Sequence, residues 1–151
     1  MSKKLNLTQG RVAIVDDDDF EWLSRSKWYY MSTGYAAKKF SGRNFYMHWT
    51  VIGRPLKGMV TDHINGNGLD NRKSNLRTVS QSENLKNSKL RKDNTSGFKG
   101  VSQMKKTGRW RARIQIEHKQ THLGSFKTAE EAHRAFRKAC IQYYGEFARL
   151  N

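Results

Sequence analysis

Cysteine is almost absent from this 151-residue sequence, which contains only Cys140. A single cysteine excludes a disulfide framework and a zinc site built on paired cysteines. No apolar run reaches the roughly eighteen residues of a transmembrane helix, and the first thirty residues lack the apolar core of a signal peptide. We therefore expect an intracellular, cytoplasmic protein that does not contact a membrane.

Acidic residues are also scarce, since 13 Asp and Glu face 29 Lys and Arg, for a formal net charge of +16. Residues 1–90 carry 15 basic and 8 acidic side chains, and residues 91–151 carry 14 and 5. A positive charge of this size indicates a polyanionic partner, with nucleic acid as the first choice. The hydrophobic content of 36% is too high for a disordered basic tail.

A polar, basic segment divides the chain after its midpoint. Residues 88–97 are almost free of apolar side chains, which is typical of a linker. Ten extended residues reach roughly 30 Å, about one turn of duplex DNA. We predict an N-terminal module over 1–87, this linker, and a C-terminal domain over 98–151. An ordinary surface loop is the alternative interpretation of the segment.

The N-terminal part predicts short strands and a short helix. Residues 11–15 favour a strand by their β-branched content. The acidic run Asp16–Asp19 suits the positive N-terminal end of a helix over 20–24, an interpretation we prefer to a metal site. Further strands are predicted over 28–31, 35–40 and 44–47.

The C-terminal part predicts a three-stranded sheet followed by one helix. The strands are expected over 98–104, 109–117 and 120–126, with turns at 105–108 and 118–119. Thr128 and Glu131 have the spacing of a capping box that starts a helix, and Gly145 is a natural stop. Packing this helix on the sheet buries both apolar faces and makes Cys140 a core residue. The predicted fold class is α+β.

Residues 61–77 combine an Asp-His pair with a Gly- and Asn-rich reversing loop. Phosphodiester hydrolysis needs a base for water and a Lewis acid for the developing charge. Neutral His63 can accept a proton near pH 7, and the Asp62 carboxylate can hold a hard divalent cation. Because neighbours on a strand point to opposite faces, they can share a site only where the strand bends into the loop.

This pattern resembles the HNH homing-endonuclease family, in the branch with Asp-His-Ile-Asn-Gly (62–66), Asp-Asn-Arg (70–72) and Asn-Leu-Arg (75–77). The resemblance implies a ββα-metal centre over about residues 46–87. It makes His63 the general base, assisted by Asn75, which positions the loop and the His ring. It makes Asp62 and Asn84 the ligands of one divalent cation. A carboxamide oxygen suits Mg²⁺, or Mn²⁺ as the alternative, better than zinc.

His48, Arg72 and Arg77 are further candidate site residues near this motif. Ser80 and Glu83 have capping-box spacing, which would place Asn84 in the first turn of a helix. Relatives often carry a histidine at the position of His48, so the resemblance implies a supporting role near the scissile phosphate, with a plainly packed histidine as the alternative. Arg72 and Arg77 are expected to contact DNA phosphates.

The second predicted C-terminal strand alternates apolar and basic side chains. Trp110, Ala112, Ile114 and Ile116 would face a core, and Arg109, Arg111, Arg113 and Gln115 would form the opposite face. Such a ladder of positive charges is explained poorly by folding alone, and a polyanion would neutralise it. A small sheet can also enter the major groove of DNA, where arginine often pairs with guanine.

This half resembles the APETALA-type DNA-binding domain of ethylene-response factors, through residues 98–101, 108–112, 123–126 and 128–132. The resemblance implies that the sheet contacts DNA through Lys99, Ser102, Met104, Arg113, Gln115, Gln120 and His122. We add Arg109 and Arg111 from the alternation alone. Ser102, Met104 and His122 depart from the family's usual residues, so its target sequence does not carry over.

Together the two halves predict a sequence-directed, homing-type DNA endonuclease of a phage or bacterial mobile element. We expect it to act as a monomer on double-stranded DNA. A catalytically inactive two-domain DNA-binding regulator is the main alternative, and an RNA-binding protein is a third.

Overall fold

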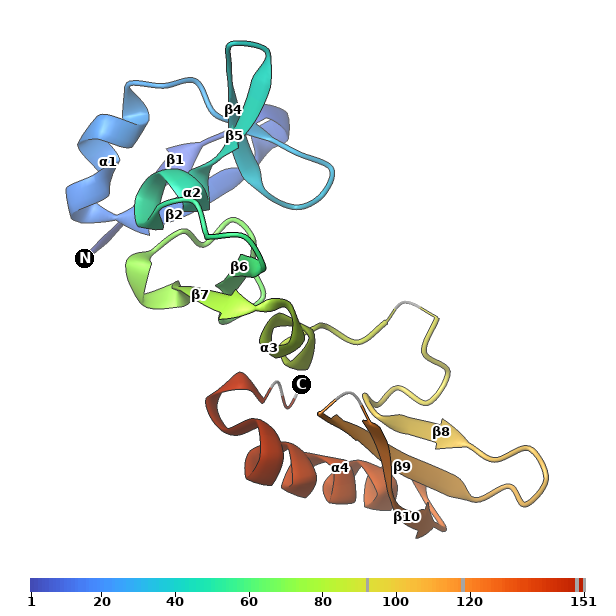
Figure 1. Cartoon of the computed structure of the whole chain (residues 1–151). Helices are drawn as coiled ribbons and strands as arrows, with labels where there is room; N and C mark the ends of the chain where they lie inside the picture. Colours follow the sequence, from blue (N-terminus) through green and yellow to red (C-terminus); the bar gives the residue numbers. More distant parts are fainter. Residues whose placement is uncertain (92, 118, 149, 151) are drawn as a thin grey trace. The chain divides into compact units, whose positions relative to one another are not determined.

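Short strands, in runs of up to three, are separated by helices along the chain (Figure 1). The computed structural model describes residues 1–91, 93–117, 119–148 and 150, which divide into two units, 1–84 and 85–151. Helices combined with small antiparallel sheets confirm the predicted α+β class at this level. Within the described residues, no helix is long and apolar enough to cross a membrane.

The first unit holds three small antiparallel sheets among its described residues, with strand orders β1-β2, β3-β4-β5 and β6-β7. Its elements in order are β1 (Ser2–Asn6), a 3₁₀ turn (Thr8–Gly10), β2 (Val12–Asp16), α1 (Asp17–Ser24), β3 (Tyr29–Tyr30), β4 (Ala36–Phe40), β5 (Arg43–Tyr46), α2 (Met47–Ile52), β6 (Met59–His63), a 3₁₀ turn (Lys73–Asn75), β7 (Leu76–Ser80) and α3 (Gln81–Lys86). Helix α3 extends two residues into the second unit.

The core of the first unit lies between the β1–β2 hairpin, α1 and the start of α2. Leu5 pairs with Ala13 across the hairpin, and Ala13 and Val15 are fully buried on its inner face, as the alternation of a strand requires. Leu23 of α1 and Met47 of α2 belong to the same cluster, together with Trp28 and Ala36. The prediction that residues 44–47 form one strand is wrong at Met47, because burial of this side chain is achieved by starting a helix there.

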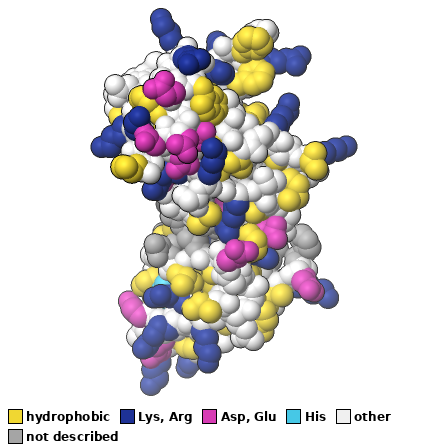
Figure 2. Space-filling model, turned by 90° about the vertical axis from the view of Figure 1, so that its left-hand side faces the viewer, with side chains coloured by type: hydrophobic (Ala, Val, Ile, Leu, Met, Phe, Trp, Pro, Cys, Tyr) yellow, Lys and Arg dark blue, Asp and Glu magenta, His cyan; other side chains and the backbone are white. Residues whose placement is uncertain are grey.

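The acidic run begins α1, as predicted, and is neutralised by lysines. Asp17–Asp19 form the first turn of the helix. The Asp17 carboxylate pairs with Lys3 at 2.7 Å, and that of Asp19 pairs with Lys73 at 2.8 Å. Figure 2 shows acidic side chains gathered on the first unit with Lys and Arg side chains beside them. The acidic run therefore begins a helix, and its carboxylates connect that helix to Lys3 of β1 and to Lys73.

The second unit is one three-stranded antiparallel sheet of order β10-β9-β8 with a helix packed on it. Its elements are β8 (Val101–Gln103), β9 (Trp110–Ile116), β10 (Lys119–Phe126), α4 (Ala129–Tyr144) and a 3₁₀ turn (Gly145–Phe147). Both bonds of the predicted capping box are present, because Thr128 accepts from the Glu131 amide and the Glu131 carboxylate accepts from the Thr128 amide. The three strands, the helix and its end at Gly145 are confirmed. His118, in the second predicted turn, lies outside the described residues.

The core of the second unit includes Ala112 and Ile114 of β9 with Phe136 and Cys140 of α4. Burial raises the pKa of the Cys140 thiol to about 11, which agrees with a packing role. Strand β8 begins later than predicted because Gly100 precedes it at φ 72°, a conformation that favours glycine.

The segment predicted as a linker, residues 88–97, falls inside the second unit, and Lys92 within it lies outside the described residues. The Ser96 hydroxyl lies 2.9 Å from the Phe98 carbonyl oxygen and 3.0 Å from that of Val101. The Asn94 side-chain NH₂ group donates to the Phe98 carbonyl oxygen at 3.1 Å. These bonds fold the end of the segment onto the start of β8, so less of it can serve as a connection than the sequence predicted.

Candidate active site and nucleic-acid interface

The Asp-His pair ends strand β6. Asp62 stands opposite Arg77 of β7, and His63 stands opposite Leu76. Both members of the pair are buried, each with 5% of its surface exposed. The strand stops at His63 and the chain reverses immediately, so this pair lies at the bend where two successive side chains can serve one site.

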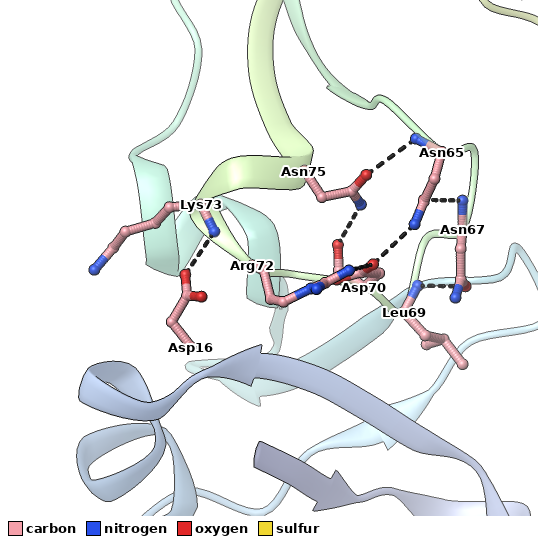
Figure 3. A network of polar contacts seen from close by, with 8 residues as sticks. All are labelled: Asp16, Asn65, Asn67, Leu69, Asp70, Arg72, Lys73 and Asn75. Carbon is pink, nitrogen blue, oxygen red and sulfur yellow. Dashed lines mark hydrogen bonds and ion pairs between the residues drawn. The ribbon is translucent and has the colours of Figure 1, made fainter. Parts of the chain in front are cut away.

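A network of asparagine side chains holds the loop after His63 (Figure 3). The Asn75 carboxamide accepts a bond from the Asn65 amide at 3.0 Å and donates to the Asp70 carbonyl oxygen at 2.7 Å. The Asn65 side chain donates to the Asp70 carboxylate at 2.8 Å and accepts from the Asn67 amide at 2.8 Å. Asn75 therefore bridges both ends of the loop, and its role in catalysis stays a prediction.

Strand β2 anchors the same loop from the other side. The Ile14 amide donates to the Leu69 carbonyl oxygen at 2.8 Å, and the Asn71 amide donates to the Ile14 carbonyl oxygen at 2.7 Å. Asn71 is fully buried, with no exposed surface. Backbone bonds thus fix the residue whose side chain reaches the candidate base.

The imidazole of His63 is held among buried polar and aromatic groups. Its Nε2 lies 3.5 Å from the Asn71 Oδ1, and its ring centroid lies 5.2 Å from that of His48. Burial lowers the pKa of His63, while the contact with Asn71 and the charges of Asp62 and Asp70 oppose that shift. The result favours a neutral imidazole, the form that can accept a proton.

His48 is a second buried imidazole in this site, at the start of α2. Its ring stacks on Tyr46 at 5.3 Å and meets Tyr35 edge-to-face at 5.3 Å. Burial, aided by the neighbouring His63, lowers its pKa to about 3. Its buried Nδ1 has no hydrogen-bond partner among the described residues. His48 therefore lies beside the candidate base, though its supporting role stays a prediction.

Arg77 holds the Asp62 carboxylate. Its Nε and Nη2 lie 2.9 Å and 2.8 Å from the same oxygen, Oδ2. The side chain of Arg77 is 16% exposed and that of Asp62 is 6% exposed. A pair this buried fixes the direction of the carboxylate.

Arg72 makes a similar fork on Asp70. Its Nε lies 2.8 Å from Oδ1 and its Nη2 lies 2.6 Å from Oδ2, and this guanidinium holds the pKa of Asp70 below its ordinary value. Both arginines predicted to bind phosphate therefore engage carboxylates of the loop and hairpin, and their contact with DNA stays a prediction.

Asn84 lies on α3, four residues beyond Ser80. The predicted capping box is present, since the Glu83 amide donates to the Ser80 hydroxyl at 3.3 Å and the Ser80 amide donates to the Glu83 carboxylate at 2.8 Å. Ser80 stands opposite Met59, at the other end of the hairpin from His63. The meeting of Asp62 and Asn84 around one cation stays a prediction. Within the described residues, no three His, Cys, Asp or Glu side chains cluster as metal ligands.

The predicted basic face of the C-terminal sheet has the expected alternation. Ala112 and Ile114 are buried, whereas Gln115, Gln120 and His122 are exposed. Across the sheet, Arg111 stands between Ser102 and Ser125, Arg113 faces His122, and Gln115 faces Gln120. The structure thus brings six of the nine predicted sheet contacts onto neighbouring positions: Ser102, Arg111, Arg113, Gln115, Gln120 and His122.

The other three predicted contacts are placed differently. The Lys99 ammonium donates to the carbonyl oxygens of Lys86 and Ser88, both at 2.8 Å. Met104 and Arg109 flank the β8–β9 turn, where the Met104 amide donates to the Arg109 carbonyl oxygen at 2.8 Å. The Lys99 ammonium therefore binds backbone carbonyls near the end of α3. To contact DNA as predicted, it would have to bond to these carbonyls and to DNA at the same time.

Sequence reasoning missed several residues of the site, above all Asn65, Asp70, Asn71 and Tyr35. The Tyr35 ring lies 5.7 Å from that of His63, although 28 residues of sequence separate them. The density of Asn and Asp between 65 and 71 was a usable signal, because these side chains commonly bond to nearby backbone in turns. Nothing local in the sequence pointed to Tyr35.

Comparisons with known proteins cover the segment that carries Asp62 and His63. The family model described as HNH endonuclease matches residues 52–86. Protein 3.8 of Escherichia phage T7 is 37% identical over 103 residues, covering 68% of this chain and 84% of that protein. The protein named "Uncharacterized HNH endonuclease L560", of Acanthamoeba polyphaga mimivirus, is 28% identical over 148 residues, covering 95% of this chain and 76% of that protein.

A plant protein matches a shorter part of the chain. APETALA2-like protein 2 of Oryza sativa subsp. indica is 40% identical over 57 residues, which are 38% of this chain and 13% of that protein. No solved structure matches.

Proposed function

We propose, given that this chain belongs to the HNH endonuclease family and is a nuclease acting on DNA, that it is a sequence-directed, homing-type enzyme. Its substrate is double-stranded DNA, it acts as a monomer, and it works inside a cell that carries phage or mobile-element DNA. The observation that supports this best is the buried Asp62–His63 pair at the bend of β6, held by an asparagine network.

In this proposal His63 takes a proton from the attacking water. Its buried, pKa-lowered ring is neutral near pH 7, as a general base must be. Asn71 contacts one ring nitrogen, and Asn75 closes the loop that carries Asn71. His48 excludes water from one side of the ring without competing for the proton, because its own pKa lies near 3.

The family generally uses a divalent metal, and the donors here fit one. Asp62 and Asn84 offer a carboxylate and a carboxamide oxygen, which are hard donors suited to Mg²⁺, or to Mn²⁺. Both bonds from Arg77 end on one Asp62 oxygen, so the carboxylate is already oriented. Bound there, a cation would stabilise the charge that develops on the phosphate during hydrolysis.

DNA affinity is assigned to the sheet of the second unit, a domain of about residues 98–151 joined to the N-terminal nuclease module of residues 1–87. Its outer face presents Arg111 and Arg113 between polar neighbours. The similarity to a plant APETALA2-like protein over 57 residues supports this assignment. We therefore propose an APETALA-like DNA-binding domain here, with the nuclease module cutting within reach of the intervening segment.

The test is nicking of supercoiled plasmids that carry random inserts, in Mg²⁺. His63→Ala should abolish nicking and leave DNA binding in EDTA nearly unchanged, because the base does not contribute to affinity. Nicking by His63→Ala at the wild-type rate would remove His63 from the mechanism. A wild-type protein that shifts DNA in gels but never nicks it would favour the regulator.

Asn84→Ala tests the cation site, with Gln81→Ala as its control on the exposed side of the same helix. Asn84→Ala should weaken Mn²⁺ binding, measured by electron paramagnetic resonance, and nicking together. Gln81→Ala should leave both unchanged. Equal Mn²⁺ affinity in the two variants would exclude Asn84 as a ligand.

A further inference from the structure

A cavity of about 570 Å³ opens on the first unit, and neither Asp62 nor His63 lines it. Strand β5 and helix α2 line it with Phe45, Tyr46 and Trp49, and Arg43 and Arg54 stand among these rings. No acidic side chain lines it. Its volume falls within the range of roughly 300–1,000 Å³ that is typical of small-ligand sites.

One aromatic ring of this cavity, Phe45, is open to solvent, and the exposed Phe40 packs beside it. Phe45 is 42% exposed, and its edge-to-face partner Phe40 is 67% exposed. Figure 2 shows hydrophobic side chains beside Lys and Arg side chains at the height of the β4–β5 hairpin. Single exposed apolar residues are ordinary, but a cluster of them marks a binding surface.

Trp49 and the guanidinium of Arg54 form a pair in the lining of the cavity. Its ring meets that of Tyr46 edge-to-face at 4.6 Å, and the Arg54 guanidinium carbon lies 5.2 Å from its ring centroid. Nucleobases stack on aromatic rings and on arginine planes alike. Arginine also pairs with phosphate through charge-assisted hydrogen bonds. The lining therefore offers stacking surfaces and positive charge in one place.

A polar group at the rim adds a means of contact with a base edge. The Asn44 side chain also lines the cavity, and its oxygen accepts a bond from the Tyr29 hydroxyl at 2.7 Å. This bond fixes the carboxamide, whose NH₂ group supplies donors for a further acceptor.

The cavity shares two aromatic side chains with a second cavity that lies next to the candidate site. Tyr46 and Trp49 also line a second cavity of about 230 Å³, which His48 borders. The His48 ring in turn lies 5.2 Å from that of His63. A nucleotide in the larger cavity would therefore sit beside the site of phosphodiester cleavage.

We propose that this cavity binds an unpaired nucleotide of DNA, with its base stacked against Phe45 and the Trp49–Arg54 pair and a phosphate paired with Arg43. A duplex keeps its base faces inside the stack, so only an unpaired or extruded base can present them. The placement beside the cut rests on the proposed function, but the binding itself does not. Binding and cleavage can therefore fail separately.

The test measures binding of a short labelled oligothymidylate in EDTA by fluorescence anisotropy. Trp49→Ala and Arg54→Ala should each weaken binding by about five- to one-hundred-and-fifty-fold, the range for losing one stacked base. Phe45→Leu should also weaken binding, and we expect it to fold because Phe45 is 42% exposed and leucine keeps an apolar side chain there. Trp22→Ala, which removes a 38%-exposed indole of α1 outside the cavity, is the matched control and should have no effect.

A second probe separates stacking from charge. An oligomer of abasic sites with the same number of phosphates should bind far more weakly than the oligothymidylate. Equal affinity for the two oligomers, or equal losses in Trp22→Ala and Trp49→Ala, would overturn the proposal. His63→Ala should bind oligothymidylate like the wild type, so loss of nicking alone leaves the cavity assignment intact.

Discussion

The buried His48 should make the first unit less stable as the pH falls. Its ring is 6% exposed, and its pKa drops from the ordinary 6.5 to about 3 on folding. Between these values the unfolded chain binds a proton that the folded chain rejects. Stability must therefore begin to fall near pH 6.5 and continue to fall toward pH 3.

The magnitude follows from the same two pKa values. A shift of one unit corresponds to 1.36 kcal/mol, so His48 alone should lower the free energy of unfolding by about 2 kcal/mol between pH 7 and pH 5. His63, whose pKa is also lowered by burial, adds a loss of the same sign. In a marginally stable unit, a change of this size is easily measured.

Urea unfolding followed by tryptophan fluorescence can measure the effect in the first unit alone. In a Trp110→Phe background the remaining tryptophans, Trp22, Trp28 and Trp49, all lie within residues 1–84. The free energy of unfolding at pH 7 and pH 5, extrapolated linearly to zero urea, gives the pH dependence directly.

The control is His48→Phe, which keeps an aromatic ring and removes the titrating group. This variant should lose the part of the pH dependence that His48 supplies and keep the part from His63. If His48→Phe loses as much stability as the parent between pH 7 and pH 5, His48 does not fold as a proton-rejecting buried group and the reasoning fails.

Three further predictions concern the second unit and the DNA. Gly100→Ala should destabilise the unit by about 2–5 kcal/mol in thermal unfolding, because it adds left-handed strain and places a Cβ 2.2 Å from the Phe136 ring. The control is Gly108→Ala, which has a similar φ and nothing within 4 Å of the added Cβ. This variant should show only the cost of the strain. Cys140, with its pKa near 11, should resist alkylation at pH 8 until the protein is unfolded. DNA affinity should fall about 10³–10⁵-fold between 50 and 200 mM salt if six to ten phosphates are contacted, and a flat dependence in gel-shift titrations would contradict a basic interface.

The C-terminal unit was predictable because its signals are local and agree with one another. Alternation along β9, the capping box of Thr128 and Glu131, and the helical spacing that buries Phe136 and Cys140 all require the same sheet and helix. The structure differs mainly at strand ends, where Gly100 and the bonds of Ser96 decide the boundary. Such ends depend on a few hydrogen bonds that composition does not reveal.

The N-terminal unit was harder because its short elements depend on distant partners. Met47 has no local signal that ends a strand, and its place in the core decides that a helix begins there. The strand β1 is polar and mostly exposed, and only its pairing with β2 makes it a strand. Tyr35 reaches His63 through tertiary packing alone.

The two arginines of the Asp-His motif engage carboxylates that the motif did not point to, while their predicted phosphate contacts stay a prediction. From sequence, basic residues in a nuclease suggest phosphate contacts, but the structure gives Arg72 and Arg77 to carboxylates of their own unit. Removing one partner of a buried ion pair destabilises a protein by about 3–5 kcal/mol. The first role of Arg77 is therefore to stabilise the buried Asp62 carboxylate.

The two arginines nevertheless differ in what they can still do. The side chain of Arg72 is 38% exposed, and its bonds to Asp70 use only part of a guanidinium that has five donors, so it can add a phosphate without leaving its partner. Arg77 is 16% exposed and would have to break a buried pair. We therefore expect Arg72, rather than Arg77, to contact phosphate, and we expect Arg77 to act through the Asp62 carboxylate that it orients.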